Sequence, residues 1–418
     1  MQKIHEKSRL TPVLAETEVL VVGSGPAGLA AAVSAARQGV RTMLVERYGC
    51  FGGVISQVGV EGIAWYRYEG TVDVEGIGIE FEQRAAAMGG TQKRPYSGGE
   101  RLDADLFKVV ADQFVLEAGV VPLLHSLAVD VIMEDDAIKG IITESKSGRQ
   151  AILAERVIDA TGDADIAYRA GAPCQKTSKE EMMGVTVIFS CSGVDRDRFL
   201  EYVEEHPATY ANWGQNWAIE TTGKEDDLFT AYLEEPFNKA RQAGLIPEDL
   251  TSIGGTWSTI TETGEATSLN MIYMLGYDST DVGDLTRAEM EGRHQAMLAI
   301  EALRRYQPGF EKAKLRNFGM TLGTRESRNI VGRYNMTGDD VRNQARFDDS
   351  IGIFPEFLDG HGLLILPTTG RYFQIPYQII VPQNVDNLLV AGRCVAADKI
   401  ARTALRSMMC CTVTGQAA

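Results

Sequence analysis

The chain has 418 residues, enough for about two domains, and its 44% hydrophobic and 23% charged residues are typical of a soluble globular protein. Its formal net charge of −16 argues against nucleic acid and against anionic membranes as main partners. No apolar run of about 18 residues is present, and residues 1–17 lack the apolar core of a signal peptide. We therefore expect a cytoplasmic protein that does not enter a membrane.

The first structured segments predict a strand, a helix and a second strand. EVLVVG (18–23) is a β-branched run that ends in glycine, and VRTMLVE (40–46) has the same buried-strand pattern. Between them, the alanine-rich segment 26–39 has the pattern of a helix that packs closely on a sheet. Together the three segments predict a βαβ unit at the start of a parallel sheet.

The turn between the first strand and the helix reads GSGPAG, a nucleotide-binding pattern. Gly23 permits the tight turn, Gly25 lets the backbone approach a pyrophosphate, and Gly28 lets the helix pack on the strand. The phosphates would lie at the positive N-terminus of the helix, beside Pro26 and Ala27. Because the pattern follows a strand and opens a helix, we expect this turn to bind a nucleotide.

Glu46, at the end of the second strand, helps to distinguish which nucleotide binds. Its carboxylate can accept hydrogen bonds from both ribose hydroxyls and would repel a 2′-phosphate, so NADP is disfavoured. Gly52 and Gly53 allow the backbone to approach the pyrophosphate closely a second time and to continue toward a flavin, which favours FAD over NAD. Arg47 is a further candidate for contact with the cofactor. Cys50 precedes the two glycines, but none of the six cysteines forms a C-x-x-C pair. We therefore expect no disulfide relay and no metal site.

The remaining segments follow in chain order. Residues 102–119 predict a helix, residues 120–162 an antiparallel meander that feeds a last buried strand, and residues 387–393 (NLLVAGR) return to the buried-strand pattern. Between these segments, residues 173–365 carry charged helical patterns and predict an inserted cap domain. Residues 401–418 begin a further helix.

Several blocks of the sequence resemble the FAD-dependent oxidoreductases of the glutathione-reductase-like superfamily, relatives of the fumarate reductase flavoproteins. Besides the glycine pattern, the blocks are residues 145–173, 324–341 and 373–418, so the resemblance covers nearly the whole chain. It implies an α/β fold with a Rossmann-like FAD-binding domain of the glutathione-reductase type and an inserted α+β cap domain for the substrate. The two domains would comprise residues 1–172 with 366–418, and residues 173–365.

The resemblance also implies where part of the cofactor lies. Thr161 and Gly162 match the turn that runs past FAD, and Ala128 lies in the strand expected beside the adenine. Asp163 and Asp165 follow the turn; they could contact the cofactor or equally cap the next helix.

The C-terminal block would close the flavin site. Gly392 and Arg393 end the closing strand, beside the ribityl chain. A helix near residues 402–407, which include Arg406, would aim its positive N-terminus at the flavin pyrimidine and stabilise the anionic reduced flavin. The H-G-x-N-R pattern of the fumarate reductases is absent after this strand, so their dicarboxylate chemistry is not carried over.

Three residues are candidates for catalysis. Arg325 and Arg328 are three apart and would share a face of a helix, although the segment could equally be a strand; their guanidinium groups could clamp a carboxylate or polarise a carbonyl. The alternative is that one of them pairs with Glu326 or residues 339–340 and braces the domain interface. His361, in a glycine-rich loop, could move protons or could be an ordinary surface histidine.

Aromatic residues offer a further set of candidates. The segments AWYRY (64–68) and NWGQNW (212–217) could line an aromatic pocket, and Tyr372 and Tyr377 could border the open face of the flavin. In each case packing inside the fold is the simpler alternative.

The sequence predicts an FAD-dependent oxidoreductase that transfers hydride between a small organic substrate and flavin N5 at the domain interface. One alternative is an electron-transfer subunit that passes electrons to a protein partner, and another is a flavin-binding protein without turnover. No second G-x-G-x-x-G occurs mid-chain, which disfavours stable NADH binding. We expect a small-molecule partner; a homo-oligomer or an electron-transfer partner stays open.

Overall fold

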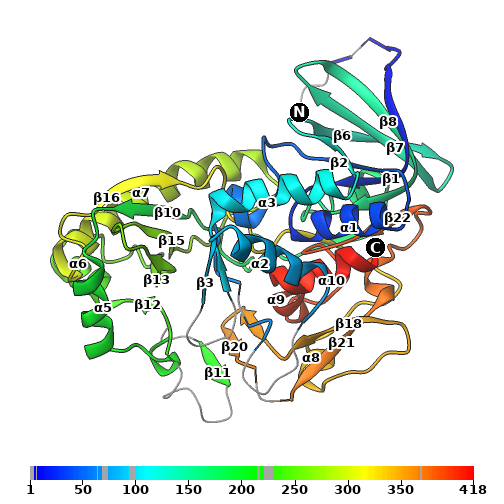
Figure 1. The fold of residues 1–418 in the computed structure, drawn as a ribbon. Coiled ribbons are helices and arrows are strands. Elements are labelled where there is room, and N and C mark those ends of the chain that lie inside the picture. The colour runs from blue at the N-terminus through cyan, green and yellow to red at the C-terminus, as the bar shows by residue number, and fades with distance from the viewer. Residues whose placement is uncertain are drawn as a thin grey trace.

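The computed structural model describes residues 4–5, 7–63, 65–67, 74–93, 100–213, 217–220, 229–367 and 370–418. Figure 1 shows two main sheets toward opposite ends of the molecule, with helices packed between them and against them.

The first sheet has seven strands, and its centre is parallel. Strand β1 (Val13–Val22) lies between β2 (Thr42–Val45) and β8 (Gly148–Asp159), and β5 (Val121–Leu123) follows β2. The end of β8 pairs with the parallel strand β22 (Leu388–Val390), whereas its first half pairs with the antiparallel meander of β7 (Ala137–Ser145) and β6 (Leu127–Glu134). The carboxyl ends of the parallel strands therefore meet at one edge, where such sheets bind ligands.

A group of helices packs beside this sheet (Figure 1). Helix α1 (Pro26–Arg37) begins directly after the β1 turn, with Pro26 pre-set for the first helical position, and its residues 26–33 are all buried. Helix α10 (Met408–Ala417) crosses α1 so closely that a Cβ on Gly415 would lie 2.1 Å from the Ala27 carbonyl oxygen. Helices α2 (Ile77–Ala87) and α3 (Ala104–Glu117) complete the group, and the Asp103 carboxylate caps α3.

The second sheet is antiparallel, and the long helix α7 (Val282–Tyr306) covers one of its faces. Leu269 and Met271 of its strand β15 (Ala266–Ile272) are buried in the core that α7 shares. Ser268 and Asn270 alternate with them and face a cavity on the opposite side. The other strands are β10 (Phe189–Ser192), β12 (Tyr232–Leu233), β13 (Ile253–Thr256), β14 (Thr259–Ile260) and β16 (Lys314–Phe318), and helices α5 (Arg196–Glu205) and α6 (Glu235–Gln242) flank them.

Short strands and helices make up the other described elements. The strand pairs are β3 (Thr91–Lys93) with β4 (Glu100–Leu102), β9 (Cys174–Lys176) with β17 (Arg328–Ile330), β18 (Ser350–Pro355) with β21 (Tyr372–Pro376), and β20 (Leu363–Ile365) with both β11 (Ala218–Glu220) and β19 (Leu358–Gly360). The short helices are η1 (Val54–Val58, a π-helix), α4 (Asp165–Arg169), η2 (Tyr210–Asn212), α8 (Gly338–Arg342), η3 (Tyr377–Ile380) and α9 (Ala401–Leu405).

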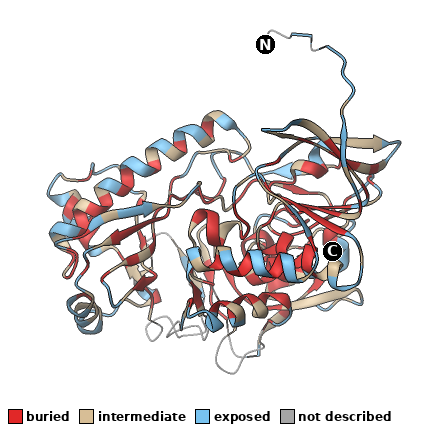
Figure 2. Ribbon diagram, turned by 45° about the horizontal axis from the view of Figure 1, so that its top comes forward, coloured by how far each residue is buried: buried red, intermediate tan, exposed pale blue. Residues whose placement is uncertain are grey.

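Buried apolar residues form two clusters, one for each sheet. The first cluster surrounds the parallel sheet and also takes in later parts of the chain, such as residues between Ile330 and Ile380. The second cluster consists of residues between Val185 and Leu322 in the sequence. Figure 2 shows exposed residues along the outer face of the long helix α7 and buried ones among the helices in the middle of the molecule. No helix among the described residues is both long enough and apolar enough to cross a membrane.

The predicted fold class is confirmed: a parallel Rossmann-like sheet carries a second, antiparallel domain. The predicted division into residues 1–172 with 366–418, and residues 173–365, stays a prediction. The C-terminal segment differs from the expectation of one helix, because it forms α9 and then α10, with a break at Ser407, whose ψ is 139°.

Candidate active site

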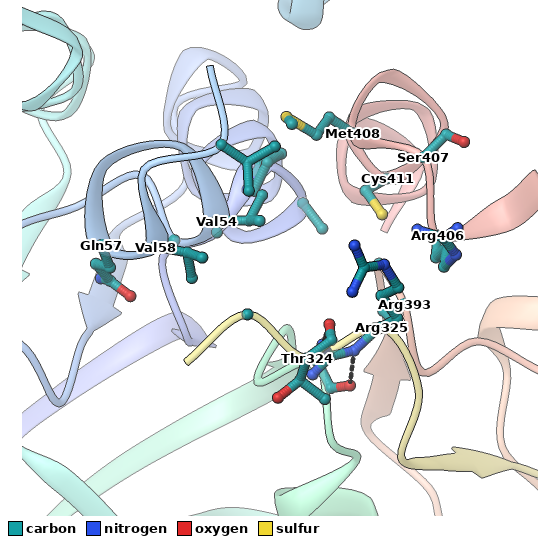
Figure 3. Close-up of a pocket in the computed structure, with 18 of the residues that line it drawn as sticks. Val54, Gln57, Val58, Thr324, Arg325, Arg393, Arg406, Ser407, Met408 and Cys411 are labelled. Carbon is teal, nitrogen blue, oxygen red and sulfur yellow. Dashed lines mark hydrogen bonds between the residues drawn. The ribbon is translucent and has the colours of Figure 1, made fainter. Parts of the chain in front are cut away.

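One cavity of about 430 Å³ touches both sheets. It begins at the turn after β1, passes the ends of β2, β8 and β22, and reaches β13 and β15 of the second sheet. Figure 3 shows its middle, where Val54 and Gln57 of η1 lie across the cavity from Arg325, Arg393 and Arg406.

The glycine turn forms one end of the cavity. Gly23 has φ +94°, and a Cβ there would lie 2.5 Å from the Ala160 carbonyl oxygen; a Cβ on Gly28 would lie 1.8 Å from the Gly23 carbonyl oxygen. These two glycines are therefore required by the fold itself. Gly25 is different, because its nearest neighbour would be the Gly53 Cα at 4.0 Å, and it lines the cavity. The open space at Gly25, at the N-terminus of α1, fits the pyrophosphate of a dinucleotide.

Glu46 lies beside this turn and is 5% exposed. Its Oε2 accepts hydrogen bonds from the Ser24 backbone N–H (3.0 Å) and hydroxyl (2.6 Å), and its Oε1 accepts one from the Tyr48 N–H (2.9 Å). The carboxylate is thus fixed at the cavity wall with lone pairs left for ribose hydroxyls. Arg47 and Ala128 line the same end.

The turn after β8 is organised by Asp159, a residue that the sequence-based reasoning missed. Its buried carboxylate accepts hydrogen bonds from the Thr161 N–H and hydroxyl and from the Ile166 and Ala167 N–H groups. Asp159 therefore caps α4, whereas the side chains of Asp163 and Asp165, the two candidates for this role in the sequence, do not. An acidic residue at the end of an apolar strand was the available signal.

Arg393 joins three parts of the cavity wall. Its Nε donates to the Gly162 carbonyl (2.9 Å), its Nη2 donates to Asp163 Oδ1 (2.6 Å), and its Nη1 donates to the Thr324 carbonyl. The preceding Gly392 has φ +85° and is held by the Thr414 hydroxyl of α10 (3.0 Å). The closing strand is thus tied both to the β8 turn and to α10.

The helix N-terminus that reaches the cavity belongs to α10. Arg406, Ser407, Met408 and Cys411 line the cavity there (Figure 3), whereas Ala401 and Arg402 at the start of α9 do not. The prediction of a helix that starts near residue 402 was therefore one helix too early. Arg406 Nη2 donates to the Asp359 carbonyl (2.5 Å) and to its Oδ2 (3.2 Å). Burial raises the pKa of the Cys411 thiol to about 12, so this sulfur stays protonated.

Arg325 faces the cavity from the loop before β17. Its Nη1 donates to the Gly184 carbonyl (3.0 Å), its Nη2 donates to Asn270 Oδ1 (3.3 Å), and its Cζ lies 4.8 Å from the centre of the Tyr273 ring. Burial, and then repulsion from Arg406, lowers the pKa of Arg325. Asn270, which the sequence did not single out, thus orients the predicted catalytic arginine.

Arg328 does not line the cavity. It opens β17, its Nη2 bonds to Asp165, and its Cζ lies 4.3 Å from the centre of the Tyr168 ring. The segment is a loop and a strand, so the helical face that Arg325 and Arg328 would share does not exist. Arg328 is braced as the alternative proposed, but with Asp165 as its partner.

His361 is also absent from the cavity lining, and it is not a surface histidine. Its side chain is 9% exposed, and its Nε2 lies 3.2 Å from Glu326 Oε2. Glu326 also contacts Thr177, the Met183 N–H and Arg402. Burial alone would raise the pKa of Glu326, but these contacts outweigh it and lower that pKa to about 2. The result is a buried polar brace behind the cavity.

Aromatic side chains line the far end of the cavity. Trp65 lies 6.0 Å from Tyr210 and 6.3 Å from Phe357, and Tyr210 lies 5.5 Å from Trp213, all between ring centroids. The two predicted aromatic segments thus contribute Trp65 and Trp213. Their residues 64, 68 and 214–216 lie outside the described ranges, and Tyr372 and Tyr377 do not line the cavity.

Most of the predicted cofactor residues line this one cavity. Gly28 is an exception because it supports the turn from behind, and Gly52 is another because it packs against Phe107 and Ser56. The predicted residues in the lining are Gly23, Gly25, Pro26, Ala27, Glu46, Arg47, Gly53, Ala128, Thr161, Gly162, Asp163, Gly392, Arg393 and Arg406. Among the described residues, no cluster of His, Cys, Asp and Glu could hold a metal ion.

A parallel sheet whose glycine turn and strand ends form one wall of a cavity, closed by an antiparallel domain, is the architecture of an FAD-binding oxidoreductase. The chain belongs to the FAD dependent oxidoreductase family, which it matches over residues 18–418. FAD is its cofactor, and the predicted family, enzyme class and cofactor are confirmed.

Individual relatives are more distant. The chain is similar to the thiamine thiazole synthase of Methanococcus vannielii, at 32% identity over 161 residues, 36% of this chain and 57% of the relative. The chain thus spans less than two thirds of that relative. A solved geranylgeranyl bacteriochlorophyll reductase-like protein from Thermoplasma acidophilum aligns with 96% of this chain and 76% of its own, at 15% identity and a TM-score of 0.49. The FAD complex of glycerol-3-phosphate dehydrogenase from Bacillus halodurans aligns with 44% of this chain and 41% of its own, at 18% identity and a TM-score of 0.30.

Proposed function

We propose that this enzyme transfers a hydride between a small organic substrate and N5 of its flavin, at the interface of the two sheets. The observation that carries the proposal is the continuity of the cavity. The glycine turn that fits the dinucleotide and the polar face of β15 belong to one space, so a substrate held against β15 shares one compartment with the cofactor.

The chain's own residues supply binding and electrostatics. When bound, FAD accepts or donates a hydride at its isoalloxazine ring. We assign the pyrophosphate to Gly25, the ribose to Glu46 and the closing contacts to Arg393. The N-terminus of α10 gives the middle of the cavity a positive potential, which favours negative charge there.

The substrate side is the wall made by the second domain. It carries the hydroxyls of Thr186, Thr230, Thr256 and Ser268, the amide of Asn270, and the guanidinium of Arg325. A wall of hydrogen-bonding groups that ends in aromatic rings suits an organic molecule better than a protein surface. This wall supports a small-molecule substrate over a protein electron acceptor.

Anaerobic bleaching of the flavin tests the proposal. Purified holoprotein is mixed with a panel of small organic donors or, after photoreduction, with small organic acceptors, and the visible flavin absorbance is followed. We expect an organic molecule to change the flavin redox state in a stoichiometric, saturable reaction. We expect NADH alone to act slowly, because the second sheet is antiparallel and the sequence has no second G-x-G-x-x-G pattern mid-chain. Reduction that occurs only through a protein partner would instead establish an electron-transfer subunit.

A further inference from the structure

Three arginines converge on the middle of the cavity (Figure 3), and two of them are neutralised. Arg393 pairs with Asp163 at 2.6 Å, and Arg406 pairs with Asp359 at 3.2 Å. Arg325 donates to a backbone carbonyl and to the Asn270 amide, and it makes no ion pair with a carboxylate of the described residues. Of these three arginines, Arg325 is therefore the one without a carboxylate partner at ion-pair distance.

The position of Arg325 is held by its neighbours. The Tyr273 ring lies under the guanidinium, and Asn270 Oδ1 also accepts a hydrogen bond from the Thr186 hydroxyl (2.9 Å), which fixes the amide. Two of the five guanidinium N–H groups are used in these contacts. Burial of a cation without a counter-ion lowers the stability of the folded protein unless an anion binds beside it. A fixed guanidinium without a carboxylate partner at a cavity wall therefore indicates an anionic ligand.

The rest of that ligand must suit the aromatic end of the same cavity. Trp65, Tyr210 and Phe357 are at most 5% exposed, and Trp213 stacks on Tyr210 at an interplanar angle of 25°. Rings that line a cavity in this way favour a flat apolar body through stacking and exclusion of water. The guanidinium of Arg325 and these rings therefore favour a ligand that has an anionic group at one end and a flat apolar body at the other.

We propose that the substrate is a carboxylate with a flat apolar body, whose anionic group binds Arg325 and whose body packs among Trp65, Tyr210, Trp213 and Phe357. The planar fork of an arginine binds a carboxylate through two parallel N–H···O hydrogen bonds. The inference rests on the proposed function and specifies its substrate class.

The test is a titration of the oxidised holoprotein, monitored by the perturbation of the flavin absorbance spectrum. The probes are benzoate, cinnamate and indole-3-acetate, the amide of each, acetate, and methyl phosphate. We expect a saturable response to at least one aromatic carboxylate, with its amide, acetate and methyl phosphate each at least about tenfold weaker. Arg325→Met should weaken carboxylate binding about 10- to 100-fold and leave amide binding unchanged.

Two further variants keep the outcome unambiguous. Arg325→Lys retains the charge and should bind carboxylates with intermediate affinity. This variant tests the proposal even if Arg325→Met does not fold. Arg293→Met removes an exposed arginine on α7 and should bind like the wild type. Amides that bind as well as their acids, methyl phosphate that binds more tightly, an unchanged Arg325→Met variant, or no response to any probe would each overturn the proposal.

The two proposals fail separately. If organic molecules bleach the flavin but acids and amides act alike, the carboxylate class is wrong and hydride transfer stands. If carboxylates perturb the flavin through Arg325 but no organic molecule changes its redox state, the anion site stands and the proposed reaction is wrong.

Discussion

Gly25 and Gly28 lie three residues apart in one turn, yet substitution by alanine should affect different properties of the enzyme. At Gly25 the backbone has φ −64° and ψ −177°, which alanine adopts without strain, and no protein atom lies nearer than 4.0 Å to the new Cβ. Loss of glycine at the helix N-cap costs about 0.5–1 kcal/mol, and the reduced freedom of the unfolded chain offsets about 0.4–1 kcal/mol. The free energy of unfolding of the apoprotein should therefore change by less than about 0.5 kcal/mol.

FAD affinity should respond in the opposite way. The methyl group of Gly25→Ala would lie in the open space assigned to the pyrophosphate, where it separates the backbone N–H groups from a charged partner. Hydrogen bonds to charged groups contribute about 1.5–3 kcal/mol each, so affinity should fall about 10- to 100-fold. The assays are FAD titration of the apoprotein and thermal unfolding of the same sample.

Gly28→Ala is the matched comparison. Its Cβ would lie 1.8 Å from the Gly23 carbonyl oxygen, well inside the 3.4 Å at which ordinary contact begins. Because the carbonyl belongs to the backbone and a Cβ is bonded directly to the backbone, no side-chain rotation can relieve the clash. Helix α1 must therefore move off the sheet, at a cost of about 1–3 kcal/mol or more. Full FAD affinity in Gly25→Ala, or unchanged stability in Gly28→Ala, would refute the assignment of the turn.

Two buried carboxyls should have opposite effects on stability against pH. The folded pKa of Glu326 is lowered from 4.5 to about 2, so its contribution to the free energy of unfolding, about 3 kcal/mol, is complete above pH 4.5 and disappears as pH falls toward 2. The free energies of unfolding of the wild type and Glu326→Gln, measured in urea, should therefore converge as the pH falls over that range. A constant difference between them would contradict this prediction. Burial raises the pKa of Glu61 to about 7, so wild-type stability should fall as pH rises from 4.5 through 7, whereas Glu61→Gln should lack this decline of about 3 kcal/mol. Treatment of the native protein with iodoacetamide should leave Cys50 unmodified, as judged by mass spectrometry, because this residue is 8% exposed and burial raises the pKa of its thiol. Rapid labelling of Cys50 would contradict this prediction and would support a redox role for the thiol.

The sequence by itself determined the features that depend on neighbouring residues. Gly23, Gly25 and Gly28 meet local backbone requirements of a strand–turn–helix, and Glu46 follows at the end of the next strand, so the nucleotide turn could be read directly from their order and spacing. The buried-strand pattern at residues 387–393 was visible for the same reason, since a strand covered on both faces is apolar throughout.

Only the tertiary structure decided which polar residues meet. Arg325 and Arg328 are chemically equivalent in the sequence, but the first lines the cavity with Asn270 as a partner, whereas the second pairs with Asp165 and does not line the cavity. Their partners lie 55 and 163 residues away along the chain. His361 was drawn into a buried brace with Glu326 in the same manner. Periodicity and spacing report the local backbone, whereas the direction of a long polar side chain is set by whichever distant donor or acceptor the folded chain brings within hydrogen-bonding distance.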